Sequence, residues 1–160
     1  MSEIFKWLII LSVIPFFALL FFVRKAFVKN INISAELIKI SSTVGFIICV
    51  LCILLNIIDV ASYITYSSLF KLLFSITTTL NIIAYHFFNK SISKPKYISK
   101  SIAIVIFSSI LNIALTLLFN LYFIRFISVS AMPVNIVFAI INIILLVFSI
   151  IINKAVRSNC

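Results

Sequence analysis

Apolar and polar positions divide this chain into five apolar runs separated by short, mostly basic connections. The runs cover residues 5–23, 42–62, 69–88, 101–123 and 134–152. Each is close to the about 20 residues that a helix needs to cross a bilayer. Lipid-exposed backbone must form its hydrogen bonds internally, and uninterrupted apolar runs exclude the alternating pattern of a barrel. The pattern therefore predicts an all-α, polytopic integral membrane protein, with a five-helix transmembrane bundle as a single domain over residues 1–160.

The second run carries its small and polar residues on one helical face. Gly45, Cys49, Cys52, Asn56 and Asp59 follow one another in steps of four, three, four and three, which is the spacing of one side of a helix. The opposite side carries only apolar residues. Asn and Asp on a shared face are unfavourable in a helix that contacts only lipid. We therefore interpret this run as the inner helix of the bundle.

The third, fourth and fifth runs also carry polar side chains, in the last two at regular helical spacing. Such residues form hydrogen bonds between membrane helices, each contributing about 0.6 kcal/mol on average. The first reading of these stripes is therefore that they hold the helices together. The residues are Ser75, Thr78, Thr79 and Asn81 in the third run, Ser109, Asn112, Thr116 and Asn120 in the fourth, and Asn135, Asn142 and Ser149 in the fifth.

The first run has almost no polar stripe. Ser12 is its one hydroxyl, so we expect this helix at the periphery of the bundle. Pro15 predicts a kink, which membrane helices tolerate where a neighbour supplies a hydrogen bond to the freed carbonyl. The connection that follows, residues 24–41, mixes basic and apolar residues and is typical of a short amphipathic helix on the membrane surface.

Composition supports the membrane assignment and leaves no room for a separate soluble domain. Hydrophobic residues make up 64% of the chain and charged residues 10%, against roughly half and a quarter in soluble domains. The basic residues that give the chain its net charge of +10 lie between the apolar runs and not on the face of a soluble domain. We therefore assign it to topology and to anionic lipid headgroups, and expect no direct binding of nucleic acid.

The basic residues also predict an orientation, since Lys and Arg collect on the cytoplasmic side of short loops. A five-helix path places ten of them inside and three outside, which favours an external N-terminus and an internal C-terminus. A four-helix count is the alternative. The internal residues are Arg24, Lys25, Lys29, Lys39, Lys90, Lys94, Lys96, Lys100, Lys154 and Arg157; the external ones are Lys6, Lys71 and Arg125.

The chain has few residues of the types that carry out catalysis. It has one His and one Gly, which excludes a histidine metal cluster and a glycine-rich phosphate loop, and its three acidic residues do not form a carboxylate pair along the sequence. Cys49 and Cys52 are spaced as in some metal sites, but structural zinc needs four ligands. We predict no enzyme activity, no cofactor and no metal.

Two sets of residues are the candidates for function. One candidate, Asp59, has two interpretations. It is a functional intramembrane carboxylate, or it is a hydrated residue that ends its helix at the headgroup boundary. The intramembrane contacts are Asn56, Asp59, Asn81, Asn112, Thr116 and Asn142, and the inner-face basic contacts are Arg24, Lys25, Lys29, Lys90, Lys94 and Lys96.

These features predict a small, non-catalytic, multi-pass protein of a bacterial inner (plasma) membrane that acts through contacts with a protein partner or with its own copies. Two settings fit that physics by analogy: a membrane subunit of an antiphage defence system, or an immunity protein against a pore-forming toxin. The alternative is a subunit of a small-solute or ion transporter or channel, in which the polar stripes line a path.

Overall fold

The computed structural model describes the backbone of residues 3–28, 35–62, 66–122 and 132–158, and the side chains of residues 7–26, 35–58, 72–118 and 134–158. Over these residues the chain is helical and has no strand, which confirms the prediction of an all-α fold. The long helices are α1 (Glu3–Val23), α2 (Ala35–Ser62), α3 (Tyr66–Ser91), α4 (Tyr97–Tyr122) and α5 (Met132–Ser158). A short π-helix, η1 (Arg24–Val28), continues α1.

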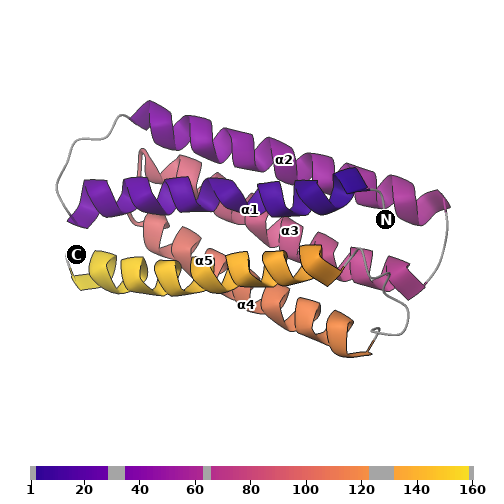
Figure 1. Ribbon diagram of the computed structural model, residues 1–160. Helices are drawn as coiled ribbons and strands as arrows, with labels where there is room; N and C mark the ends of the chain where they lie inside the picture. The colour runs from indigo at the N-terminus through magenta and orange to yellow at the C-terminus, as the bar shows by residue number, and fades with distance from the viewer. Residues whose placement is uncertain (1–2, 29–34, 63–65, 123–131, 159–160) are drawn as a thin grey trace.

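The helices form an up-and-down bundle in which each one runs antiparallel to its predecessor (Figure 1). Consecutive helices pack against one another, and α1 also packs against α5. One end of the bundle therefore carries the C-terminal ends of α1, α3 and α5 together with the N-terminal ends of α2 and α4, at the left of Figure 1.

Four helices are long and apolar enough to cross a membrane within the described residues, namely α1, α2, α4 and α5. These helices indicate a membrane protein. The remaining long helix, α3, is the least apolar of the five. Its apolar sequence is interrupted by consecutive threonines at 77–79 and by the polar residues Asn81 and His86. It packs between α2 and α4.

The first helix is central, and the expectation that it lies at the periphery is wrong. Half of its spanning segment is buried, compared with 28% for α2 and for α5. Lipid tails and a protein core are equally apolar, so the lack of a polar stripe does not place a membrane helix on the outside. The core residues that α1 supplies are Ile9, Ile10, Val13, Phe16, Leu19, Leu20 and Val23.

The second helix is correspondingly less central than its polar face suggested. Its small and polar side does point inward: Gly45, Cys49, Cys52 and Asn56 are all buried. The remainder of α2 exposes a wide aliphatic surface, for example at Ile47, Leu51 and Ile58. A polar stripe therefore identified the buried face of the helix, but not the position of the helix in the bundle.

The connection over residues 24–41 is not a separate surface helix in its described parts. Residues 24–28 extend α1 as η1, and residues 35–41 are the first two turns of α2. The physical reason is continuity of the backbone ladder, because extending an existing helix adds one hydrogen bond per residue without a new nucleation cost.

Candidate functional site

Buried amide and hydroxyl side chains, together with the half-buried Ser75, form a line through the bundle that connects α2 to α3, α3 to α4 and α4 to α5. We call this line the polar seam. All its asparagines are at most 3% exposed, so their polar groups are removed from lipid and from water. The members of the polar seam are Asn56, Ser75, Asn81, Ser108, Asn112, Thr116 and Asn142.

Each helix pair along the seam is joined by a side-chain hydrogen bond. Asn56 Nδ2 donates to Ser75 Oγ over 3.1 Å. Ser108 Oγ donates to Asn81 Oδ1 over 2.6 Å. Between α4 and α5, the Asn112 amide donates to the Asn142 carbonyl oxygen over 3.1 Å. Unpaired polar groups are costly in lipid, so these bonds favour one packing arrangement of α2 to α5.

Four buried oxygen atoms have no hydrogen-bond partner within the described part of the chain. They are Asn56 Oδ1, Asn112 Oδ1, Ser149 Oγ and Asn153 Oδ1. A buried acceptor without a partner is costly. The seam is therefore joined across each helix pair but retains spare acceptors.

A second polar contact joins α3 to the central helix. The Tyr85 hydroxyl donates to the Ser12 carbonyl oxygen over 2.6 Å. Pro15 has no N–H to offer the Leu11 carbonyl, its usual helical acceptor, so the backbone ladder of α1 is interrupted there. The tyrosine hydroxyl bonds the next carbonyl along the helix, that of Ser12. This bond joins α3 to the backbone of α1 beside Pro15.

The ring of Tyr85 reaches α1 by crossing α2 at the chain's one glycine. A Cβ atom at Gly45 would overlap the ring atoms of Tyr85. On its other side the ring stacks on Phe16, with centroids 4.0 Å apart and parallel planes. Gly45 is therefore needed for close approach, and it allows one side chain to connect α1, α2 and α3.

The cations gather at the end of the bundle where α1, α3 and α5 finish (Figure 1). We call this end the basic end. Within the described side chains, all nine Lys and Arg residues lie there, and Glu36 is the only acid. Most of them are exposed. The residues are Arg24, Lys25, Lys39, Lys90, Lys94, Lys96, Lys100, Lys154 and Arg157.

Aromatic rings organise part of this charge. The ammonium groups of Lys90, Lys96 and Lys100 lie 5.1, 5.6 and 5.7 Å from the ring centroid of Tyr97. Tyr97 is itself stacked on Phe87, with centroids 5.6 Å apart. Cation–π contacts of this kind contribute about 0.5–1 kcal/mol at exposed sites, so the three lysines are held together at the turn between α3 and α4.

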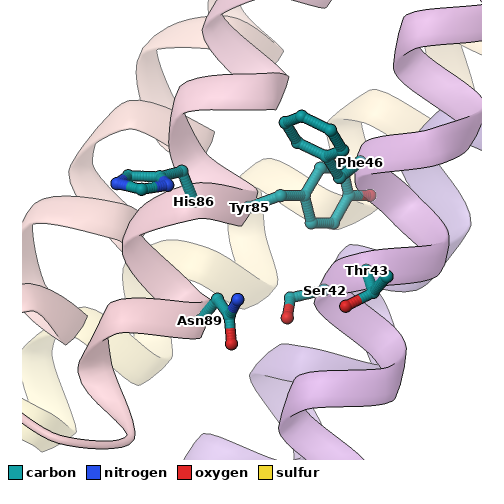
Figure 2. A pocket seen from close by; sticks show the side chains of 6 residues that line it. All are labelled: Ser42, Thr43, Phe46, Tyr85, His86 and Asn89. Carbon is teal, nitrogen blue, oxygen red and sulfur yellow. The ribbon is translucent and has the colours of Figure 1, made fainter.

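A half-open cavity of about 250 Å³ lies between α2 and α3, close to the basic end. Figure 2 shows Asn89 on α3 and Ser42 on α2 pointing toward one another across the opening, with the ring of Tyr85 reaching over to α2. Ser42 is buried and donates to the Lys39 carbonyl oxygen over 3.0 Å. The lining residues are Ser42, Thr43, Phe46, Tyr85, His86 and Asn89.

The structure places the predicted site residues in different surroundings. The predicted amide and hydroxyl contacts Asn56, Asn81, Asn112, Thr116 and Asn142 lie in the polar seam. The side chain of Asp59 and residue Lys29 lie outside the described residues. The remaining predicted basic contacts, Arg24, Lys25, Lys90, Lys94 and Lys96, lie at the basic end.

Sequence reasoning missed two parts of this arrangement. Ser108, adjacent to the predicted stripe of α4, is the residue that bonds Asn81. The contact of Tyr85 with Gly45 and with the backbone next to Pro15 was not predicted either. A single glycine and a mid-helix proline in separate apolar runs were the available signals, but their partner could not be identified without the fold.

The described residues contain no group of three or more His, Cys, Asp or Glu side chains that could hold a metal ion. Cys49 and Cys52 are buried free thiols. No protein-family model, curated protein or solved structure matches this chain. The polar seam, the basic end and the cavity are the features of the chain that bear on its function.

Proposed function

We propose that the chain is a non-catalytic, multi-pass protein of a bacterial inner membrane that acts by binding an acidic protein partner at its basic end. One observation carries the proposal: the nine described cations share one end of the bundle with a single described acid. Such a surface attracts a negatively charged partner and discriminates against basic ones.

The proposed topology has five spanning helices, an external N-terminus and an internal C-terminus. The basic end is the cytoplasmic side in this topology, in agreement with the preference of Lys and Arg for that side. The less apolar α3 spans because Thr77, Thr78 and Asn81 are buried against its neighbours. A reporter protein that is active only in the cytoplasm should be active when it is fused after residue 160. An inactive fusion protein, which indicates an external C-terminus, would contradict this topology.

Two biological settings would use such a surface, and both remain proposals. In an antiphage defence system, the basic end would hold a soluble effector at the membrane. As an immunity protein against a pore-forming toxin, the exposed aliphatic faces of α2 and α5 would also contact the toxin's inserted helices. Contacts between copies of this chain would use the same faces.

Charge reversal at the turn between α3 and α4 tests the proposed contact. The substitutions Lys90→Glu, Lys94→Glu and Lys96→Glu in one chain should reduce partner recovery at least tenfold in co-purification from membranes. The matched control carries Arg at the same positions and should recover the partner as the natural chain does. Partner recovery that survives charge reversal, with insertion unchanged, would overturn the proposal.

A subunit of a transporter or channel is the second candidate. The four buried oxygens without partners favour it, since acceptors in a membrane interior can bind water or a passing ion. Purified chain in proteoliposomes tests this candidate directly. Solute or ion flux by this chain alone, lost in Asn112→Leu, would replace the contact proposal.

A further inference from the structure

The cavity between α2 and α3 contains polar side chains that the bundle does not satisfy. Within the described part of the chain, the side chains of Thr43 and Asn89 form no hydrogen bond, and both are exposed at the opening. Each can donate as well as accept. Amides and hydroxyls on the flank of a membrane helix require a polar partner, so the cavity calls for a ligand with acceptor oxygens.

The depth of the cavity places it beside lipid headgroups. On α2, Lys39 lies one turn before Thr43, a rise of about 6 Å. On α3, Lys90 directly follows Asn89 and lies one turn after His86. Lysines at helix ends extend to the membrane interface. The opening therefore lies within one turn of two exposed cations.

The charge around the opening selects an anion. Lys39 and Lys90 are exposed on the two helices that form the cavity. The only described acid, Glu36, lies at the first turn of α2, beyond Lys39. Basic pockets between membrane helices on the cytoplasmic side are known binding sites for anionic lipid headgroups.

The size and the lining of the cavity further restrict the class of ligand that it can bind. The volume of about 250 Å³ is smaller than the about 300–1,000 Å³ of pockets that enclose a drug-sized molecule. It suits a headgroup and not a whole lipid. Phe46 is exposed at the same opening and offers an apolar contact for the start of an acyl chain. A free soluble anion has no use for that contact.

We propose that this cavity binds the phosphodiester headgroup of an anionic phospholipid. Thr43 and Asn89 donate hydrogen bonds to the phosphate oxygens, and Lys39 and Lys90 supply the compensating charge at the rim. Figure 2 shows Asn89 on α3 across the opening from Ser42 on α2, with Thr43 next to Ser42. The bound lipid would join α2 to α3 at the basic end, where the polar seam does not reach.

The test measures lipid binding by the full chain purified in a neutral detergent. Native mass spectrometry titrates phosphatidylglycerol and, separately, phosphatidylcholine. We expect phosphatidylglycerol to bind at least tenfold more tightly. The double variant Thr43→Val/Asn89→Leu should lose about a hundredfold in affinity for phosphatidylglycerol, the effect of two hydrogen bonds to a charged group. It leaves every cation of the basic end in place.

Controls separate this site from general effects. Thr79→Val removes an exposed hydroxyl from α3 outside the cavity and should bind phosphatidylglycerol as the natural chain does. Asn89→Asp keeps the size of an exposed side chain and adds a negative charge, so it should reduce phosphatidylglycerol binding even if the double variant does not fold.

Three results would overturn the proposal: equal affinity for the two lipids, unchanged phosphatidylglycerol affinity in Asn89→Asp, or competition by inorganic phosphate at the concentration of the lipid. Because the lysines are unchanged in both cavity variants, failure here leaves the proposed partner contact at the basic end intact.

Discussion

The polar seam and the basic end use polar side chains in opposite ways. In the seam, Asn112 and Asn142 are at most 2% exposed and bond each other across two helices. At the basic end, Lys94 and Lys96 are exposed, and one described acid faces nine cations. The seam is nearly satisfied within the chain, whereas the charge of the basic end can be neutralised only by other molecules.

This difference separates stability from recognition. A hydrogen bond in lipid holds helices together because the alternative is an unpaired group in hydrocarbon. An exposed charge contributes little to folding but attracts oppositely charged partners and lipids. Substitutions in the interior should therefore change stability, and substitutions at the basic end should change binding. The following predictions test that division.

The largest effect is expected at Gly45. Gly45→Val places methyl groups where the ring of Tyr85 lies, and should lower the free energy of unfolding by about 3 kcal/mol or prevent folding. Thermal unfolding in detergent measures the loss. Val44→Leu, at an exposed neighbouring position, is the control and should leave Tm unchanged. A natural Tm in Gly45→Val would show that α2 and α3 do not meet at this residue.

Removal of the Tyr85 hydroxyl should have the next largest effect. Tyr85→Phe leaves the Ser12 carbonyl without the hydroxyl that donates to it, at a cost of about 1–3 kcal/mol. Thermal unfolding again provides the measurement. Tyr97→Phe removes a hydroxyl from a half-buried ring at the basic end and should change Tm little. Equal losses in the two variants would contradict a stabilising bond between Tyr85 and the Ser12 carbonyl.

The amide pair of the seam should show a smaller, coupled effect. In a double-mutant cycle, Asn112→Leu and Asn142→Leu should have a coupling energy of about 0.6 kcal/mol, and at most about 1.7 kcal/mol. The pair Asn112→Leu and Asn56→Leu shares no bond in the structure and should be additive. Coupling in the second pair but not in the first would contradict the seam as described.

The smallest effect on stability is expected at the basic end. Lys94→Glu changes an exposed residue and should alter the free energy of unfolding by less than about 0.5 kcal/mol. Lys94→Gln serves as the neutral control in the same unfolding assay. A loss comparable to that in Tyr85→Phe would mean that the basic end contributes to folding, and the division between the two regions would fail.

Helical periodicity predicted the buried faces better than it predicted the positions of helices. The spacing of Asn56 on α2 and of Asn112 on α4 correctly indicated sides that the structure buries; their role in function stays a prediction. The spacing contained no information on partners, because several polar residues on each neighbouring helix could have bonded Asn112. Asn81 is an example, because its partner Ser108 lies one residue outside the predicted stripe.

The sequence by itself determined the helical class, the apolar segments, the buried faces of α2 and α4, and the grouping of most basic residues at one end. These are local properties: helical spacing and hydropathy are set by residues within a few turns. The central position of α1, the insertion of Tyr85 beside Pro15 through the gap at Gly45, and the cavity at Thr43 and Asn89 were decided only by the tertiary structure. They depend on contacts between distant segments, and inside a membrane an apolar surface is equally suited to lipid and to protein.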